Sequence, residues 1–249
     1  MINKFLLEGK KILITGASSG IGKSTAIVCS QLGAQVIFTG RNLNALNETF
    51  EQLSGIGHIF YCGDLNNEQF LQDLCNNCPT IDGLVNSAGI NLNVPFKFTK
   101  KDDFKNVMKT NFETPTLLLQ SLLKQKKISK KSSIVFVSSI SGITCTATGI
   151  SIYSASKGAI SSMIRVLAQE LASNKVRVNA VCPGMVKTEM TMNNTTYTKE
   201  QLEFDEKNNY PLGYGIPEDV ALTISFLLSD ASSWITGTNL IIDGGASTH

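Results

Sequence analysis

Residues 11–22 read Lys11-Ile-Leu-Ile-Thr-Gly-Ala-Ser-Ser-Gly-Ile-Gly22. Ile12 to Ile14 form an apolar run typical of a fully buried strand, and helix-compatible residues continue from Lys23 to Leu32. The glycines between them permit a tight turn and let backbone N–H groups approach a phosphate closely. A helix N-terminus adds unpaired N–H groups and a partial positive charge. The stretch therefore predicts a strand, a glycine turn and a helix that together cradle the pyrophosphate of a dinucleotide.

The same residues have a second interpretation, because Gly16-Ala-Ser18-Ser-Gly20 fits the Gly-x-Ser-x-Gly nucleophile elbow of α/β-hydrolases. That chemistry needs a histidine base. The chain offers only His58, which precedes a predicted strand, and His249, its last residue. A serine hydrolase using Ser18 is therefore the minor alternative, beside a strand-to-helix turn that binds nothing.

The composition predicts a globular protein, with 42% hydrophobic and 17% charged residues and no long polar tract. The net charge of +2 gives no case for nucleic-acid binding. The one basic run, residues 124–131, lies between a predicted helix and a predicted strand, which favours a solvated loop. The expected partner is a small molecule.

No segment of the sequence predicts export or membrane insertion. The N-terminus lacks the apolar region of a signal peptide, and no stretch of about 18 apolar residues appears. The six cysteines are scattered, as reduced thiols in the cytoplasm would be. Cys75 and Cys78 have metal or redox spacing, but no second close pair accompanies them, so we expect ordinary thiols and no metal site.

Strand and helix patterns alternate along the whole chain. This alternation predicts one α/β domain over residues 1–249, a doubly wound parallel sheet with helices on both faces. We expect a long helix capped by Thr99 and kinked by Pro115. Predicted strands cover 12–14, 34–39, 57–61, 83–85, 132–138, 176–181 and 239–242; predicted helices cover 23–32, 43–53, 67–74, 99–123, 152–173, 199–207 and 217–228.

Residues 185–211 are the least regular part of the chain, with one short helix predicted inside them. A long excursion after the carboxyl end of a strand is typical of an active-site lid. We therefore expect a substrate lid over residues 185–215.

Arg41 suggests which dinucleotide binds. In a nicotinamide-binding fold, an acidic residue near the end of the second strand hydrogen-bonds the ribose 2′-hydroxyl of NAD. This chain has Gly40 and Arg41 there, and a guanidinium pairs bidentately with a phosphate. NADP(H) is therefore favoured over NAD(H), which stays the alternative.

Tyr153 and Lys157 form a candidate acid–base pair. They lie four residues apart in a predicted helix, so they share one face. A neighbouring ammonium favours the phenolate and lowers the tyrosine pKa from about 10. Ser138 and Ser139 end a predicted strand at the same sheet edge, where a hydroxyl can hydrogen-bond a substrate oxygen.

These motifs together resemble those of the short-chain dehydrogenase/reductase family, nearly end to end. Ser87 replaces the family's second asparagine, an exchange of one small polar residue for another that we expect to be tolerated. Ser139 is preferred because Ile-Ser-Gly142 follows it, as in the family's Ser-x-x-Gly, while Ser138 and Ser141 stay open. The resemblance is carried by Thr15-Gly-Ala-Ser-Ser-Gly-Ile-Gly22, Asp64-Leu65, Asn86-Ser-Ala-Gly89, Asn111, Ser139, Tyr153-x3-Lys157 and Pro183-Gly184-x3-Thr188.

The resemblance implies a Rossmann-like fold and hydride transfer between nicotinamide C4 and the carbon of a carbonyl or secondary alcohol. It implies Tyr153 as the proton donor or acceptor, Ser139 as the holder of the oxygen, and Lys157 as the group that lowers the tyrosine pKa and binds the ribose. Asn111 would anchor a water. It also implies a homotetramer or homodimer. The expected cofactor-binding residues are Gly16, Ser18, Ser19, Gly20, Ile21, Gly22, Arg41, Asp64, Leu65, Asn86, Ala88, Gly89, Tyr153, Lys157, Pro183, Gly184, Val186 and Thr188.

A third hypothesis is a family member that senses the nucleotide and catalyses nothing. The intact set of Ser139, Tyr153 and Lys157 argues against it, because a sensor has no need of these groups.

Overall fold

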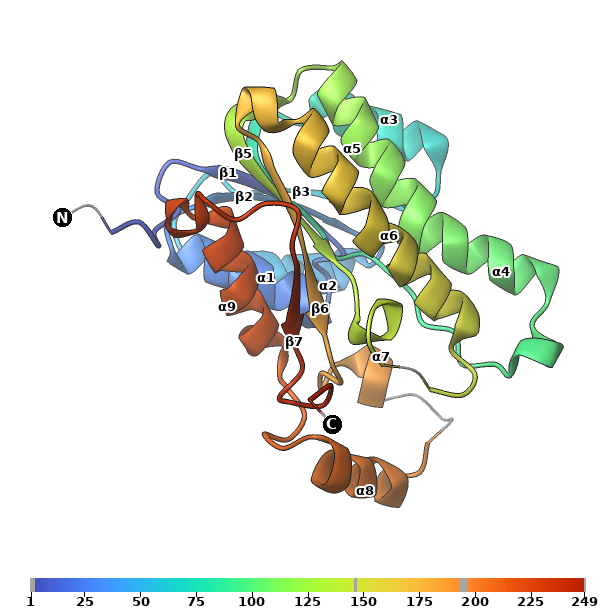
Figure 1. Ribbon diagram of the computed structural model, residues 1–249. Helices are drawn as coiled ribbons and strands as arrows, with labels where there is room; N and C mark the ends of the chain where they lie inside the picture. Colours follow the sequence, from blue (N-terminus) through green and yellow to red (C-terminus); the bar gives the residue numbers. More distant parts are fainter. Residues whose placement is uncertain (1–2, 146, 193–196, 249) are drawn as a thin grey trace.

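The computed structural model describes residues 3–145, 147–192 and 197–248 (Figure 1). Its centre is a parallel sheet of seven strands in the order β3-β2-β1-β4-β5-β6-β7. This arrangement confirms the predicted doubly wound α/β fold. The strands are β1 Lys11–Thr15, β2 Gln35–Gly40, β3 Ile59–Cys62, β4 Ile81–Asn86, β5 Ile128–Val137, β6 Arg177–Pro183 and β7 Asn239–Ile242.

Helices cover both faces of the sheet (Figure 1). One face packs against α1 and α9, and the other packs against α3, α5 and α6. Among the described helices, none is long and apolar enough to cross a membrane. The α-helices are α1 Gly20–Gln31, α2 Leu43–Glu51, α3 Glu68–Asn77, α4 Lys101–Met108, α5 Thr114–Lys124, α6 Ser151–Glu170, α7 Glu189–Met192, α8 Lys199–Asn209 and α9 Pro217–Leu228.

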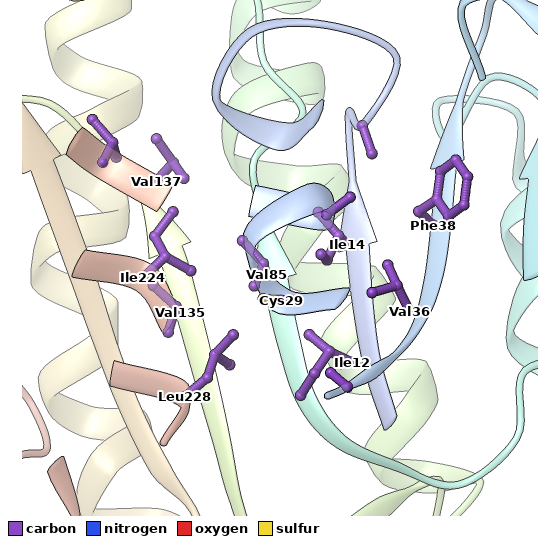
Figure 2. Packing of buried hydrophobic residues seen from close by; sticks show 14 of the residues in the cluster. Ile12, Ile14, Cys29, Val36, Phe38, Val85, Val135, Val137, Ile224 and Leu228 are labelled. Carbon is purple, nitrogen blue, oxygen red and sulfur yellow. The ribbon is translucent and has the colours of Figure 1, made fainter. Parts of the chain in front are cut away.

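Each central strand supplies side chains to both cores, because successive residues of a strand point to opposite faces. Ile12 and Ile14 of β1 belong to the core under α1 and α9, as Figure 2 shows, whereas Leu13 belongs to the core on the other face. All three side chains are fully buried. The apolar run in β1 is therefore continuous because both of its faces are covered.

The long helix predicted from Thr99 is interrupted. It consists of α4, a π-helical turn at Lys109–Glu113, and α5. Pro115 lies in the first turn of α5, where its missing N–H costs little, so it does not kink a continuous helix. Thr99 does not cap α4: the helix begins at Lys101 after Lys100, whose N–H donates to the Asp103 carboxylate at 3.0 Å.

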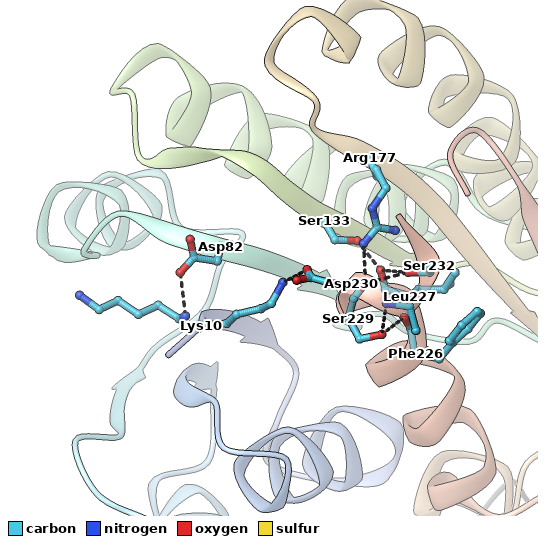
Figure 3. Close-up of polar contacts among 11 residues, drawn as sticks. Lys10, Asp82, Ser133, Arg177, Phe226, Leu227, Ser229, Asp230 and Ser232 are labelled. Carbon is cyan, nitrogen blue, oxygen red and sulfur yellow. Dashed lines mark hydrogen bonds and ion pairs between the residues drawn. The ribbon is translucent and has the colours of Figure 1, made fainter. Parts of the chain in front are cut away.

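A polar network closes the sheet at the amino ends of β5 and β6 (Figure 3). The Arg177 guanidinium donates to the Ser229 carbonyl at 3.1 Å, and the Ser133 hydroxyl donates to the Leu227 carbonyl at 2.6 Å. Nearby, the Lys10 ammonium pairs with Asp230 at 2.6 Å. Structural polar contacts thus gather at this edge, and the predicted catalytic residues lie at the opposite one.

Candidate active site

The glycine turn joins β1 to α1 at the carboxyl edge of the sheet. Gly16 has a φ of +69°, which favours glycine, and an added Cβ there would lie 2.8 Å from the Ala88 Cα. A Cβ on Gly22 would lie 2.2 Å from the Gly16 carbonyl oxygen. At both positions main-chain atoms therefore pack directly on main-chain atoms, which only glycine permits.

The amino end of α1 is free to bind an anion. Its N-cap, Ser19, makes no side-chain capping bond, and the first turn contains no acidic residue. The hydroxyl of Thr15 accepts the N–H groups of Ser87 and Ala88 at 3.1 Å each, which fixes the turn after β4 beside the glycine turn. The helix start therefore presents unpaired N–H groups to the space between the two turns.

A cleft of about 290 Å³ runs along this edge of the sheet. Every residue that the sequence analysis expected to bind the cofactor lines it, from Arg41 after β2 to Thr188 in the lid region. Ser139 lines it too, whereas Asn111 does not. Met190, inside the predicted lid, lines the cleft as well, and so do residues that the sequence did not indicate, including Thr39, Asn66, Ile90 and Thr110. The sequence could have indicated Thr39, because this residue precedes Gly40 at a strand end. Thr110 reaches the cleft only through tertiary packing, which the sequence does not indicate.

Two buried polar side chains support occupation of this cleft by a polar ligand. Both amide atoms of Asn86 and the hydroxyl of Thr39 have no hydrogen-bond partner within the described chain, and both residues line the cleft. Buried polar groups are otherwise nearly always paired. With the glycine turn and the free start of α1, they fit a dinucleotide.

The candidate catalytic residues meet where β5 ends against α6. Tyr153 and Lys157 lie one turn apart on α6, and the Lys157 ammonium is 5.7 Å from the centre of the tyrosine ring. Ser139 follows β5, and its hydroxyl lies close enough to the phenol of Tyr153 to lower the pKa of that phenol. A Cβ on Gly142 would lie 2.7 Å from the Gly158 nitrogen, so the small residue lets this loop pack directly against α6.

The three candidate serines differ in what they contact. The Ser138 hydroxyl donates to the Lys157 carbonyl at 2.9 Å and lies 2.9 Å from the Ser161 hydroxyl. The Ser139 hydroxyl accepts the Ser141 N–H at 3.2 Å and reaches Tyr153. Ser141 does not line the cleft. The geometry therefore favours Ser139, whose role is taken up below.

The expected lowering of the Tyr153 pKa is not observed. Burial raises the pKa of Tyr153, and the hydrogen bond from Ser139 opposes this only in part. Burial also lowers the pKa of Lys157 from 10.5 to about 8. Its ammonium donates to the Val137 carbonyl at 2.8 Å rather than to the phenol. Removal from water therefore dominates because Lys157 is buried and Tyr153 is half-buried in the cleft, which the i, i+4 spacing cannot reveal.

Asn111 lies in the π-helical turn, behind the cleft. Its side-chain amide donates to the Ile90 carbonyl at 2.9 Å and to the Ser156 hydroxyl at 3.1 Å, and its oxygen accepts the Ile90 N–H at 2.8 Å. It thus ties the segment after β4 to α6. A Cβ on Gly89 would meet both the Asn111 oxygen at 3.3 Å and the Lys157 ammonium at 3.5 Å.

The requirements of the hydrolase alternative are not met around Ser18. His58 accepts the Val36 N–H at 3.1 Å and contacts the Ser54 carbonyl, and it does not line the cleft that contains Ser18. His249 lies outside the described residues. Cys75 and Cys78 are buried with raised pKa values, chiefly through burial, as expected of ordinary thiols. Within the described ranges no cluster of residues could hold a metal ion.

The region after β6 folds over the far end of the cleft. Met190 and Thr191 on α7 line the cleft. The helix α8 is attached by polar side-chain contacts: Glu206 pairs with Lys187 at 2.7 Å, and Asp205 accepts the hydroxyl of the buried Tyr214 at 2.5 Å. Tyr197 accepts a bond from Asn93 at 3.1 Å. Residues 193–196 of the predicted lid lie outside the described part.

Comparisons with known proteins agree with this architecture. Residues 16–247 match the family model described as enoyl-(acyl carrier protein) reductase. The chain is 37% identical over 250 residues to the 3-oxoacyl-[acyl-carrier-protein] reductase FabG of Thermotoga maritima, covering 96% of this chain and 98% of the relative. It is 33% identical over 255 residues to a tropinone reductase homologue of Arabidopsis thaliana, covering 99% and 94%.

Solved structures show the same likeness. One described as a short chain dehydrogenase/reductase family protein has a TM-score of 0.87 and 31% identity, covering 98% of this chain and 99% of that one. Another, a putative NAD(P) dependent gluconate 5-dehydrogenase from Beutenbergia cavernae with bound NADP, has a TM-score of 0.87 and 29% identity, covering 99% and 100%.

Fold, site and relatives together define an NAD(P)-dependent oxidoreductase that interconverts carbonyl and alcohol groups. The chain belongs to the short-chain dehydrogenase/reductase family, as its motifs indicated. The relatives' printed activities differ from one another, so the family alone does not assign a substrate.

Proposed function

We propose that this protein is an NADP(H)-dependent reductase of a small carbonyl compound, with Tyr153 as the acid that protonates the new alkoxide oxygen. The observation that carries the proposal is the meeting of Ser139, Tyr153 and Lys157 at one end of a cleft whose other end contains the glycine turn. When bound, the nicotinamide supplies the hydride at C4.

Ser139 and Tyr153 hold the substrate oxygen between them. A hydroxyl that donates to this oxygen favours the negative charge that develops there during hydride transfer. Burial raises the pKa of Tyr153, so the phenol keeps its proton at neutral pH and remains the donor. Positioned proton transfer of this kind contributes about 10² to 10⁴ in rate.

Lys157 and Asn111 support this pair from behind. Lys157 would bind the nicotinamide ribose and stabilise the phenolate left after proton transfer. Both donors of the Asn111 side-chain amide are used by Ile90 and Ser156, and its oxygen accepts the Ile90 N–H, so we assign the anchoring of a water near Lys157 to its main chain in the π-helical turn.

The remaining expected residues hold the cofactor. The turn from Gly16 to Gly22 would bind the pyrophosphate, with Ser18, Ser19 and Ile21 in contact. Asp64 and Leu65 would contact the adenine, and the turn from Asn86 to Gly89 would pack along the cofactor. The segment Pro183, Gly184, Val186 and Thr188 would orient the carboxamide. All of these residues line the one cleft, which supports this assignment.

Arg41 supports NADP over NAD. It follows β2, is exposed and lines the cleft near Ser18. Between Gly40 and Cys62, none of the residues that line the cleft is acidic. A guanidinium at this position can pair with the 2′-phosphate of NADP. For the 2′-hydroxyl of NAD it is no better a hydrogen-bond partner than water. The neighbouring structure described with bound NADP is consistent with this choice.

The test is an equilibrium titration of the purified protein with NADPH and, separately, NADH, followed by nicotinamide fluorescence. Tighter NADPH binding is expected, and Arg41→Ala should weaken NADPH by about 10-fold or more, the scale of a lost charged hydrogen bond, while leaving NADH unchanged. Tighter NADH binding would overturn the assignment of Arg41. Binding of neither would overturn the proposed function.

We also expect the chain to form a homodimer or homotetramer. Strand β7 is an edge of the sheet, and apolar side chains stand exposed near it, including Ile241 and Trp234, the latter 98% exposed. Exposed apolar groups beside an unpaired edge favour association. Sedimentation velocity of the wild type and Trp234→Glu measures this; a monomeric wild type would contradict it.

A further inference from the structure

The two ends of the cleft differ in charge. Among the residues that line it, the charged side chains are Arg41, Asp64 and Lys157. Arg41 and Asp64 follow β2 and β3, at the end that would hold the adenosine. Lys157 is therefore the one charged lining group described at the end that contains Tyr153, where the substrate would react.

Lys157 is badly placed to bind a substrate anion. Its side chain is buried, and its ammonium already donates to the Val137 carbonyl at 2.8 Å. It also stands beneath the Tyr153 ring, at 5.7 Å from the ring centre, rather than in the open space beyond the phenol. A carboxylate entering here would lose its hydration without gaining an opposite charge.

Most hydroxyls at this end are also occupied. Thr191 donates to the Val186 carbonyl at 2.5 Å and lies 3.1 Å from the Thr188 hydroxyl. The Ser138 hydroxyl is held by the Lys157 carbonyl. Ser139 and Tyr153 therefore remain to recognise a single substrate oxygen, and a polyhydroxylated chain would find few further partners among the described residues.

Three charged side chains of the lid, those of Lys187, Asp205 and Glu206, bond to partners outside the cleft. Lys187 pairs with Glu206, Asp205 accepts from Tyr214, and none of the four lines the cleft. Asp243 lies behind Gly184, where an added Cβ would come within 2.9 Å of its Cβ, and it accepts the Gly245 and Ser247 N–H groups. It adds a negative charge near this end, which further disfavours an anion.

Apolar side chains line part of the open end, beside Thr188 and Thr191. Ile90 and Val186 line it, and so does Met190, whose side chain is about half exposed on α7. Tyr210 packs its ring 3.1 Å from the position of a Cβ on Gly184. An apolar wall around one hydroxyl pair suits a ketone flanked by hydrocarbon or by a neutral ester.

We propose that the substrate is a carbonyl compound with no charge near its reacting ketone, and that the enzyme discriminates against keto acids. This inference rests on the proposed reductase function and adds the class of substrate to it. The hydride comes from NADPH and the proton from Tyr153, so reduction of the ketone to the alcohol needs no other reactant.

The test compares ethyl 3-oxobutanoate with 3-oxobutanoate, which share the reacting ketone and differ in the carboxyl charge. With saturating NADPH, kcat/KM for the ester should exceed that for the acid by at least about 10-fold, the scale of one unpaired polar group. An equal or greater value for the acid would overturn this inference and leave the reductase function standing. No turnover of either, or turnover that survives in Tyr153→Phe, would overturn the function itself and this inference with it.

A second experiment introduces a positive charge among the apolar residues that line the cleft. Met190→Arg should narrow the ratio of ester to acid by about 10-fold or more through a gain in kcat/KM for the acid. Met192→Arg is the matched control, because it makes the same exchange about 200° around α7 and Met192 does not line the cleft. A ratio that Met190→Arg leaves unchanged, or that both variants change equally, would overturn the placement of the substrate at this wall.

Discussion

The glycine turn at the cleft is built from main chain packed on main chain, whereas the lid is held by pairs of side chains. In the turn, an added Cβ on Gly16 or Gly22 would come within 2.8 Å or 2.2 Å of backbone atoms. In the lid, α8 is attached through Lys187, Glu206, Asp205 and Tyr214. Main-chain packing of this kind tolerates only glycine at each position, but polar side-chain pairs tolerate many residue types. A common cofactor site can therefore be combined with a substrate end that varies.

Tyr153 is the proposed proton donor of the reaction, so removing its hydroxyl should have the largest effect. Tyr153→Phe should lower kcat by about 10² to 10⁴, because the phenol proton is lost while the ring stays. Binding of NADPH, measured by nicotinamide fluorescence, should change little. Full turnover in this variant would remove Tyr153 from proton transfer.

Gly22→Ala tests the glycine turn. Its methyl group would collide with the Gly16 carbonyl, so the turn must open and NADPH binding should weaken by at least about 10-fold, the scale of one lost charged hydrogen bond. Gly215→Ala is the control, since a Cβ there has its nearest neighbour at an ordinary 3.5 Å. Titration and the thermal midpoint should be measured for both. Equal affinities in the two variants would contradict the close packing of the turn.

Replacing Lys157 measures how much the burial of its ammonium lowers the free energy of unfolding. Burial lowers its pKa from 10.5 to about 8, so between these values the unfolded chain keeps a proton that the folded chain has lost. Stability therefore rises with pH across this window, and the full penalty of burying the ammonium is present below about pH 8. Relative to Lys157→Met, the wild type should gain about 3 kcal/mol of unfolding free energy from pH 7 to pH 10.5.

The measurement is denaturant unfolding of both proteins across this range. The comparison with Lys157→Met cancels the titration of groups that the two proteins share. A difference in unfolding free energy that stays constant with pH would show that Lys157 is not buried as an ammonium.

The lid should show the smallest effect. Glu206→Gln removes the exposed pair with Lys187, so KM for the carbonyl substrate should rise about two- to five-fold with little change in kcat, as expected from the ~0.5–1 kcal/mol of such pairs. The effect should fade at high salt. Glu48→Gln, next to Lys23 and away from the lid, is the control. A large loss of kcat in Glu206→Gln would mean that the lid shapes the catalytic centre itself.

Local pattern was sufficient for most of the fold. The predicted bounds of α9 and β7 coincide with the structure, because Pro217 marks the start of α9 and polar loops lie on both sides of β7. The predicted start of α1 was late, since Gly20 and Gly22 are poor helix formers that nevertheless begin the helix. The π-helical turn at Lys109–Glu113 leaves no such local signal; it depends on how Asn111 bonds to Ile90 and Ser156.

By itself, the sequence determined the parallel sheet, the glycine turn and the residues gathered around it, because each depends on local spacing and on the common edge where parallel strands end. Only the tertiary structure decided which serine lies beside Tyr153, that burial raises the tyrosine pKa, and that Lys187 pairs with Glu206 in the lid. These outcomes depend on side chains that are distant in sequence and on their exclusion from water, which no local spacing encodes.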